Sequence, residues 1–398
     1  MKGIKAKLSV LLIFSVFLAG CSADGGSSAF SSEAVSTEGT TAATEPAAVE
    51  PDPVVRVIAV GDNLIHSSIY KQAAARAADG GYDFDYAYQY VEGLIAPADI
   101  AVLNQETPIA NDEFEPSNYP LFNSPTQLGD KMIDMGFNAV SHCNNHILDK
   151  GEKGLLATLD YWKSRNILVY GAYRNEAELN TIPVMEVNGI KFSFVGFMEH
   201  TNGLYLPKGS EARLVYTSEP DELERLIKKA GDASDVVVVS VHWGDETSNI
   251  IADRQKELAG KFVEWGADLI IGTQPHTVQS MEYLDKPDGG QAFAAYSLGN
   301  FISAQNRNLQ LVGLVMDLKV TKSLETGRVS ITEVKAIPVI THYGAGYSGV
   351  TVYPYSLYSA DLAKAHGIHG IRPESTFDME YINKLLKDNV PEKFLCLE

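Results

Sequence analysis

The sequence predicts an α/β fold in which mixed, layered sheets are covered by helices. Short β-branched runs alternate with amphipathic stretches, an order typical of strands joined by helices. The run Val236-Val237-Val238-Val239 is apolar at every position, as a strand must be when both faces of its sheet are covered. Later apolar runs are separated by Gly-rich or charged turns, which predicts antiparallel strands there.

The predicted elements follow in a regular order. We expect strands at 54–60, 100–103, 138–141, 167–170, 236–241 and 268–271, and helices at 67–78, 126–135, 151–165, 220–230 and 252–265. Asn188-Gly189 favours a tight hairpin turn. Later strands are expected at 293–297, 311–320 and 329–334, and residues 343–398 are expected to form a surface lobe ending in a helix at 378–387.

The N-terminal residues 1–20 have the pattern of a lipoprotein signal peptide. Three lysines precede a short apolar run, which ends in Leu18-Ala19-Gly20-Cys21; this run is too short to span a membrane as a stable helix. The tetrapeptide resembles a bacterial lipobox, in which Cys21 carries the lipid and becomes the mature N-terminus. An extracytoplasmic protein anchored to the cell membrane is therefore expected. The alternative is an ordinary secretory signal with an incidental cysteine.

The remaining chain divides into a tether and one large domain. Residues 21–53 are rich in Ser, Ala, Gly, Thr, Glu and Pro, a composition that favours a flexible segment. No internal repeat or second linker follows, so we expect one domain at 54–340 and a C-terminal extension at 341–398 packed on or near it. With only Cys143 and Cys396 left, a disulfide framework is not expected.

The charge balance limits the classes of partner. The 398 residues include 32 basic and 51 acidic side chains, a formal net charge of −19. Such a chain is unsuited to bind nucleic acid or an anionic membrane by charge alone. Metal ions or cationic partners fit better, and no nucleic acid partner is expected.

Polar clusters follow five of the predicted strands directly. The carboxyl ends of strands are where α/β sheets carry their sites, so these clusters are expected to meet. They are Gly61-Asp62-Asn63 with His66, Asn104-Gln105-Glu106, His142-Cys143-Asn144-Asn145-His146, His242-Trp243-Gly244, and Gly272-Thr273-Gln274-Pro275-His276.

The residue types in these clusters are those that bind divalent metal ions. Carboxylate, amide oxygen and neutral imidazole suit Mn, Zn or Fe, and two such ions orient a water and neutralise an anionic transition state. Each residue alone has a structural explanation: Asp62 as a helix cap, Asn144 and Asn145 as a turn, a histidine as a hydrogen-bonded core residue. Their recurrence after five strands favours the metal site.

Six sequence blocks together resemble the signature of the bacterial CapA family. They are Gly61-Asp62, Leu103-Asn104-x-Glu106-Thr107-Pro108, Asn144-Asn145-His146 with Asp149 and Gly151, Val241-His242-Trp243-Gly244, Pro275-His276, and Tyr296-Ser297-Leu298-Gly299-Asn300-Phe301. The resemblance covers residues 54–340. It implies a role in synthesis or export of poly-γ-glutamate or a related capsule polymer, and a layered α/β sandwich similar to calcineurin-like metallophosphoesterases.

The resemblance also implies roles for individual residues. Asp62 and His276 would bind one metal ion, Asn145 and His242 the other, and Glu106 would bridge both. His146 would be the general acid or an oxyanion donor.

Two departures from the family pattern affect the second ion. The family has His-Pro-His where this chain has Gln274-Pro275-His276, and Gln offers only a weaker, neutral carbonyl oxygen. A site with one metal ion is therefore as consistent with the sequence as one with two. The Asp-x-His start of classical phosphoesterases is also absent, since position 64 is Leu, and whether His66 is a ligand stays open.

Other conspicuous residues have structural explanations. Asn300 is close to the predicted site in sequence, but a tight turn explains Gly299 and Asn300 without chemistry. Cys143 is expected to be a small buried residue. The Ser-Leu-Gly order is not the Gly-x-Ser-x-Gly elbow of serine hydrolases. Three histidines outside the pattern are expected at the surface: His342, His366 and His369.

Two functions remain open from the sequence. The first is a metal-dependent hydrolase or transferase acting on a phosphoester or an acidic surface polymer. The second is a non-catalytic scaffolding or polymer-binding subunit of a membrane capsule-synthesis complex with a degenerate metal site, which Gln274 and the lipid anchor favour. A solute-binding lipoprotein is disfavoured because no two-lobed repeat is present.

Overall fold

The fold is taken from a computed structural model that describes residues 50–78, 80–110 and 113–398. Residues 51–398 form one compact unit. The predicted signal peptide, Cys21 and most of the predicted tether lie outside the described residues.

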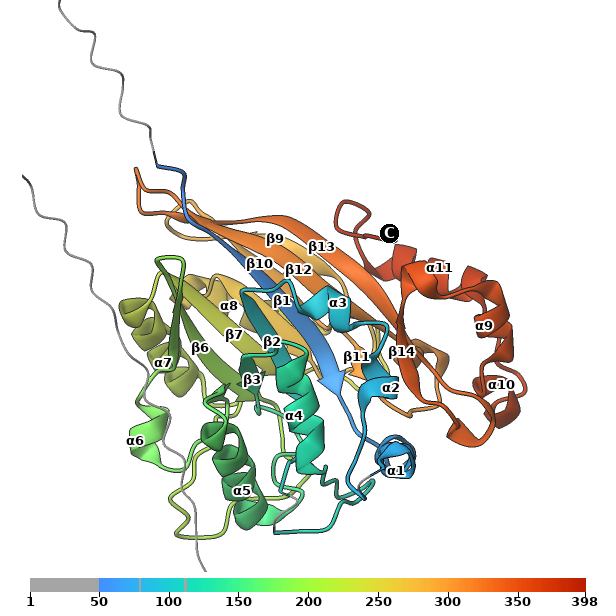
Figure 1. Cartoon of the computed structure of the whole chain (residues 1–398). Coiled ribbons are helices and arrows are strands. Elements are labelled where there is room, and N and C mark those ends of the chain that lie inside the picture. Colours follow the sequence, from blue (N-terminus) through green and yellow to red (C-terminus); the bar gives the residue numbers. More distant parts are fainter. Residues whose placement is uncertain (1–49, 79, 111–112) are drawn as a thin grey trace, which may run out of the picture. The chain divides into compact units, whose positions relative to one another are not determined.

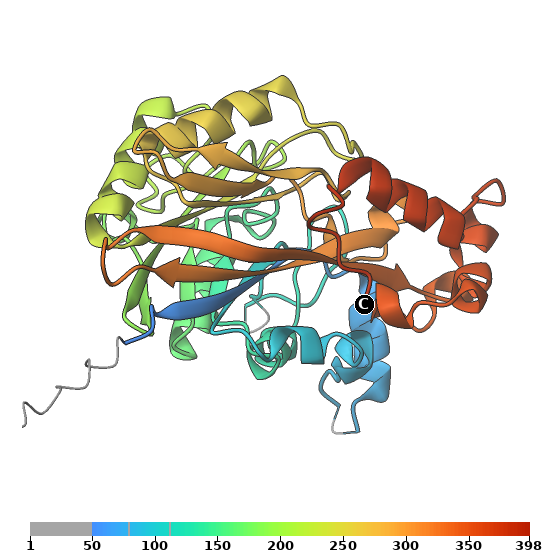
Figure 2. The same cartoon turned by 90° about the horizontal axis from the view of Figure 1, so that it is seen from above.

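Two sheets packed face to face form the centre of this unit (Figures 1 and 2). In the described residues the first sheet has eight strands and the second has six. The first has the order β14 (Thr351–Pro354), β13 (Val329–His342), β12 (Val312–Lys322), β1 (Val54–Asn63), β2 (Ile100–Gln105), β3 (Ala139–Ser141) and β4 (Leu168–Tyr170), with β11 (Asn300–Ile302) beside β1. The second has the order β5 (Val184–Val187), β6 (Ile190–Met198), β7 (Val236–His242), β8 (Leu269–Thr273), β10 (Gln291–Ala295) and β9 (Met281–Asp285).

Each sheet combines parallel and antiparallel strands. Strands β1 to β4 are parallel, as are β6, β7, β8 and β10, whereas β12, β13 and β14 are antiparallel additions to the first sheet. The predicted antiparallel arrangement is therefore confirmed for β12 and β13. For the run at 293–297 it holds on one side only, because β10 pairs antiparallel to β9 but parallel to β8.

Helices cover the outer face of each sheet, which confirms the predicted layered architecture. Helices α7 (Pro220–Ala233) and α8 (Asp253–Trp265) pack on the second sheet, while α4 (Thr126–Asp134) and α5 (Gly151–Ser164) lie over the first (Figures 1 and 2). The remaining α-helices are α1 (Ser67–Arg76), α2 (Asp85–Tyr88), α3 (Glu92–Ile95), α6 (Glu176–Leu179), α9 (Ala360–Ala365), α10 (Ile368–Ile371) and α11 (Met379–Asn389).

The alternation along β7 shows how the layers are filled. Val236 and Val238 belong to the hydrophobic cluster shared with the first sheet, whereas Val237 and Val239 belong to the cluster under α7 and α8. Successive side chains of a strand point to opposite faces, so both faces of this strand are buried. By the same alternation His242, at the end of β7, points toward the first sheet.

The C-terminal segment is integrated into the domain. Strand β14 extends the first sheet through pairing with β13, and Phe377 and Phe394 are buried in the main core. The ring of Phe394 lies 5.2 Å from that of Phe293 in β10. The tail therefore contacts the second sheet, although its strand hydrogen bonds are with the first.

One prediction for this segment was wrong. His366 is only 2 % exposed, and rings of His342, Tyr343 and Phe377 surround it. It is a core residue of the C-terminal segment, not a surface histidine, while His342 and His369 are half-buried.

In the part of the chain that the structure describes, no helix is long and apolar enough to cross a membrane.

Candidate metal centre

The backbone of β1 closely approaches the segment before β11, and this brings Asp62 and Asn300 together. A Cβ on Gly61 would lie 1.8 Å from the carbonyl oxygen of Gly299, so only glycine fits there. The N–H of Asp62 donates to that same carbonyl at 2.9 Å. Asn300 consequently pairs with Asp62 in the parallel register of the two strands.

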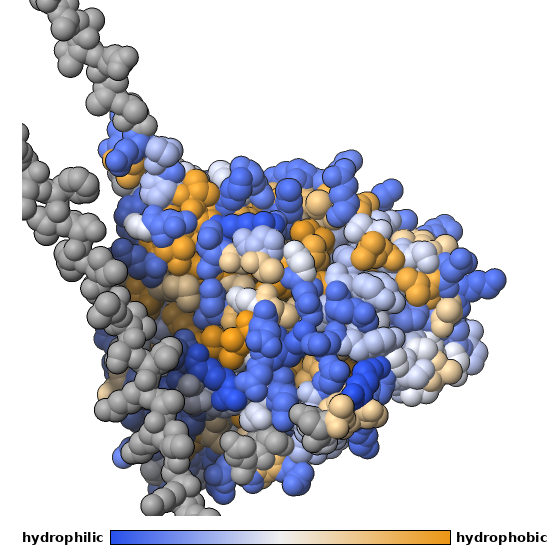
Figure 3. Space-filling view, in the orientation of Figure 1, coloured by the Kyte–Doolittle hydropathy of each residue, from blue (hydrophilic) through white to orange (hydrophobic). Residues whose placement is uncertain are grey.

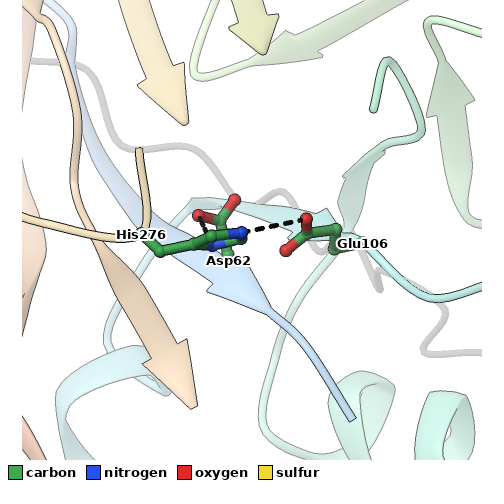
Figure 4. Close-up of side chains that lie close together, drawn as sticks. All are labelled: Asp62, Glu106 and His276. Carbon is green, nitrogen blue, oxygen red and sulfur yellow. Dashed lines mark hydrogen bonds and ion pairs between the residues drawn. The ribbon is translucent and has the colours of Figure 1, made fainter. Parts of the chain in front are cut away.

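Asp62, Glu106 and His276 converge at the carboxyl ends of their strands (Figure 4). One ligand atom from each lies within 4.8 Å of the others. His276 Nδ1 is 3.0 Å from Asp62 Oδ2, and His276 Nε2 is 3.7 Å from Glu106 Oε1. Residues 214 positions apart in the chain are thus in contact.

His242 and Asn145 complete the cluster. His242 Nε2 lies 3.6 Å from Glu106 Oε1 and 3.1 Å from Asn145 Oδ1, and His242 Nδ1 lies 3.8 Å from Asp62 Oδ1. All five side chains are at most 3 % exposed. The structure therefore brings together five of the six positions for which the sequence predicted metal ligation; the sixth is Gln274.

Glu106 is the most unusual group in the cluster. Its side chain is fully buried, and neither carboxylate oxygen has a hydrogen-bond partner in the described structure. Burial raises the pKa of Glu106 well above its usual range, although His276 opposes the shift. A buried carboxylate without partners is costly, so a cation between these residues would satisfy an otherwise unmet requirement.

The two histidines differ in protonation. Burial lowers the pKa of His242 well below its usual value, leaving the neutral form that binds metal. Burial alone would also lower the pKa of His276, but the carboxylates of Glu106 and Asp62 raise it to about 10. Both raised pKa values mean that, without a metal, the pair of Glu106 and His276 holds a proton; a divalent ion would displace that proton.

Most of the donor atoms lie somewhat farther apart than the ligands of a bound ion. Donors held about 2.1 Å from one ion in tetrahedral or octahedral geometry lie about 3.0–3.4 Å from each other. The contacts among these five side chains range from 3.0 to 3.8 Å, so small side-chain movements would bring the donors to ligand spacing. The residues therefore fit a metal ion in chemical type and in burial.

His146 stands beside the cluster and is held by an acidic neighbour. Its Nδ1–H donates to Asp149 Oδ2 at 2.8 Å, and the Phe122 N–H donates to the same oxygen at 2.7 Å. The ring also contacts Phe122 edge-on, with centroids 4.8 Å apart. Because Nδ1 is engaged, Nε2 is the nitrogen that remains for a substrate.

Gln274 lies next to the cluster but does not contact the other predicted ligands. Its Nε2 donates to the carbonyl of Gly244 at 2.9 Å and lies 3.2 Å from His200 Nε2, while its buried Oε1 has no partner. Gln274 and His276 both have positive φ, 94° and 56°. Such backbone is uncommon outside glycine and often marks functional sites.

Several supporting residues were not assigned by sequence reasoning. Asn104 Nδ2 donates to Asp62 Oδ1 at 2.7 Å, Thr273 Oγ1 is 2.9 Å from His242 Nδ1, and Asn300 Oδ1 is 3.1 Å from His276 Nδ1. Asn300 is thus at the site, a position that a turn alone does not explain. In the sequence, these residues are marked only by their positions near strand ends. Such a position does not distinguish a supporting residue from a metal ligand.

The remaining two candidates, His66 and Cys143, have surroundings that indicate a structural role. His66 Nδ1 accepts from the Ala304 N–H at 3.2 Å, and burial lowers the pKa of His66 to about 4; no contact with the five clustered residues is recorded for its ring nitrogens. Cys143 is 1 % exposed, as expected for a small buried residue.

Comparison with known proteins decides the family. The family model "Bacterial capsule synthesis protein PGA_cap" matches residues 56–305. The chain belongs to the PGA_cap family. This confirms the resemblance to CapA proteins, and every clustered residue lies within the matched range.

Two relatives carry names that refer to capsule or PGA biosynthesis. "PGA biosynthesis protein CapA" of Bacillus subtilis (strain 168) is 28% identical over 295 residues, which cover 72% of this chain and 74% of that protein. "Capsule biosynthesis protein CapA" of Bacillus anthracis is 31% identical over 235 residues, which cover 56% of this chain and 55% of that protein.

Solved structures give only distant likenesses to this PGA_cap protein. The NAD nucleotidase of Haemophilus influenzae matches at 14% identity and a TM-score of 0.42, covering 84% of this chain and 59% of that one. A putative 5′-nucleotidase of Staphylococcus aureus matches at 13% identity and a TM-score of 0.42, covering 76% and 54%. Likenesses at this level assign no activity.

Proposed function

We propose that this PGA_cap protein acts in the synthesis or export of poly-γ-glutamate or a related acidic capsule polymer, through a metal-dependent hydrolase or transferase site. The observation that carries the proposal is the buried group Asp62, Glu106 and His276, whose ligand atoms lie within 4.8 Å of one another. The names of the two CapA relatives support the polymer. A phosphoester is the other substrate class that such a site suits.

The proposed site assigns one task to each group of residues. Asp62 and His276 hold one divalent ion, His242 and Asn145 hold a second where it is present, and Glu106 bridges them. Bound Mn, Zn or Fe would polarise the scissile bond and lower the pKa of an attacking water. His146, oriented by Asp149 through Nδ1–H, would carry a second proton on Nε2 and donate it to the leaving group, or donate a hydrogen bond from Nε2–H to the developing oxyanion.

Metal-dependent turnover tests this proposal directly. Protein stripped with a chelator and reloaded with Mn²⁺ or Zn²⁺ is assayed on a generic phosphodiester and on γ-linked glutamate oligomers. We expect activity only with metal, and a loss of at least about 100-fold for Asp62→Ala or His242→Ala. Asp268→Asn, a buried carboxylate paired with Lys286 away from the site, is the control. Equal activity of the stripped protein would reject the catalytic proposal.

A scaffolding role is the second candidate, and Gln274 is the observation that favours it. An amide oxygen binds a borderline ion more weakly than imidazole, so the second position is weakened in this chain. Gln274→His should raise the metal content toward two ions per chain and increase turnover if catalysis is the function. If ligand variants still restore capsule to a strain lacking the protein, the scaffolding role holds instead.

The proposal also includes anchorage to the cell membrane through a lipid on Cys21. The tether would join the domain at the start of β1, whereas Asp62 lies near the end of that ten-residue strand. At about 3.3 Å per residue the two ends are about 30 Å apart, so the metal centre would face away from the point of attachment. Fatty-acid labelling of the full chain should disappear in Cys21→Ser; labelling that persists would contradict the anchor.

A further inference from the structure

The loop that follows β11 connects the metal centre to the C-terminal segment. The Nδ2 group of Asn300, whose Oδ1 contacts His276, lies 2.7 Å from Gln305 Oε1 and 2.9 Å from the carbonyl of Gln310. Both ends of the intervening loop are therefore fastened to a residue of the site. Arg307 lies in the middle of this loop.

Arg307 is exposed and lacks an acidic partner. Most arginines of the described residues have a carboxylate oxygen within 4.0 Å, but no such ion pair is found there for Arg307. Its recorded contact is a long one, 3.4 Å from Nη1 to Thr247 Oγ1. Thr247 in turn donates its N–H to the carbonyl of Pro275, next to His276. The guanidinium of Arg307 therefore lies near the loop that carries His276, and no ion pair is found for it in the described residues.

A pocket of about 270 Å³ lies beside this guanidinium. Its lining residues are Arg307, Asn308, Leu309, Arg372, Glu374, Ser375 and Thr376. Arg372 is the second cation; its Nη2 contacts Asn306 Oδ1 at 3.3 Å, and its Nη1 lies 3.9 Å from Glu374. Glu374 is 74% exposed at the side chain, so it only partly offsets the two positive charges.

This pocket combines two arginines in a protein that is acidic overall. The chain has a net charge of −19, and the visible surface of the domain is largely hydrophilic (Figure 3). A protein of this charge repels anions unless local positive groups oppose the field. Guanidinium groups bind carboxylate and phosphate through paired N–H donors, and the hydroxyl of Thr376 is a further donor. The Ser375 hydroxyl instead donates to Asn308 Oδ1 at 2.7 Å.

We propose that the pocket between Arg307 and Arg372 is a subsite for an anionic group of the substrate, a carboxylate or a phosphate. Because the loop is fastened to Asn300, an anion bound there is held in fixed relation to His276 and the metal centre. The identification of that anion as a carboxylate of the capsule polymer rests on the proposed function. The presence of the subsite does not.

Anion binding to chelator-treated protein tests the subsite without the metal. Calorimetry with a γ-linked glutamate oligomer and, separately, with inorganic phosphate distinguishes the two sources. We expect Arg307→Ala to weaken binding about tenfold or more, Arg307→Lys to weaken it less, and Glu374→Gln to strengthen it. Binding of only one probe identifies the anion, and either supports the subsite.

A matched control separates the subsite from general attraction. Arg328 also lacks an ion pair in the described residues, and it lies in the turn between β12 and β13. Arg328→Ala should leave binding unchanged. Unaltered binding in Arg307→Ala, or an equal loss in Arg328→Ala, would overturn the proposal. Intact anion binding without metal-dependent turnover would reject only the catalytic proposal.

Discussion

Glu106 determines how the site behaves with and without a metal ion. Both of its oxygens are buried without a hydrogen-bond partner in the described structure, while His242 and His276 approach it at 3.6 and 3.7 Å. A buried carboxylate without hydrogen-bond partners is well suited to bind a cation, but it lowers the stability of the folded protein when no cation is bound. Function and stability therefore make opposite demands at this position.

Glu106→Gln should separate these demands. In chelator the variant should be as stable as the wild type or more stable, by up to about 2 kcal/mol, because the amide carries no charge to bury. Urea unfolding measures this difference, and Asp268→Asn, which leaves Lys286 unpaired, should lose stability. A Glu106→Gln protein much less stable than the wild type in chelator would contradict this view of Glu106.

His366 predicts an acid-dependent loss of stability far from the metal centre. The Ile368 N–H donates to its Nδ1 at 3.0 Å, so Nε2–H donates to the Thr341 carbonyl at 3.1 Å. Both nitrogens are satisfied in the neutral ring. Burial lowers the pKa of His366 to about 3, below the unfolded value of about 6.5.

The sign of the effect follows from linkage. Between pH 6.5 and about 3 the unfolded chain binds a proton that the folded ring refuses, so stability is complete above pH 6.5 and falls as the pH decreases. The loss is on the order of a few kcal/mol. The free energy of unfolding, measured with denaturant from pH 7 to 4, should fall less steeply with decreasing pH in His366→Gln than in the wild type. An equally steep fall in the variant would contradict the assignment.

At the scale of elements, the strand ends were the most predictable part of the molecule. The runs at 54–60, 100–103 and 236–241 are apolar except for Arg56 and Ser240, and they continue into their polar clusters as β1, β2 and β7. Parallel strands present their carboxyl ends on one edge, so the convergence of Asp62 and Glu106 could be predicted without knowing the strand order. That His242 joins them depends on how the second sheet packs on the first.

Elements whose position depends on long-range packing could not be predicted. Strand β11 has only three residues and forms because Gly61 and Gly299 allow two backbones to meet. Strand β10 carries no local signal that tells a parallel from an antiparallel neighbour. Burial of His366 likewise depends on the docking of the C-terminal segment, which the residue type alone does not reveal.

Docking of the C-terminal tail can be tested at Phe394. The ring is 5 % exposed and packs on Phe293 and Tyr283 of the second sheet, while the backbone of Phe394 accepts from the N–H of Ala336 in β13. Phe394→Ala should cost about 3 kcal/mol of unfolding free energy. Lys393→Ala, a change at the neighbouring exposed residue, should cost less than about 1 kcal/mol. A cost below 1 kcal/mol for Phe394→Ala would contradict the docking.

The whole domain is organised so that both sheets contribute to one site. Asp62 and Glu106 come from the first sheet, Asn145 from the loop after β3, and His242 and His276 from the second sheet. The sheets also meet through a large apolar cluster and through hydrogen bonds, such as that between the hydroxyls of Tyr170 and Ser240 at 2.7 Å. An ion held by ligands from both would cross-link them at the carboxyl edge.

Metal binding should therefore stabilise the whole domain in one cooperative transition. At a Mn²⁺ concentration of about 100 times the dissociation constant, linkage predicts about 2.7 kcal/mol of added stability. On addition of Mn²⁺, the midpoint temperature of unfolding should rise by the same amount in circular dichroism and in calorimetry for the wild type. It should not change for His276→Ala. A shift of equal size in that variant would place the ion elsewhere.

Crystals of the domain soaked in Mn²⁺ and measured for anomalous scattering test the central claim most directly. The structure predicts an anomalous peak in contact with Asp62, Glu106 and His276, with or without a second peak near Asn145 and His242. Saturating Mn²⁺ that produces no peak between these side chains would contradict the claim that they form a metal centre.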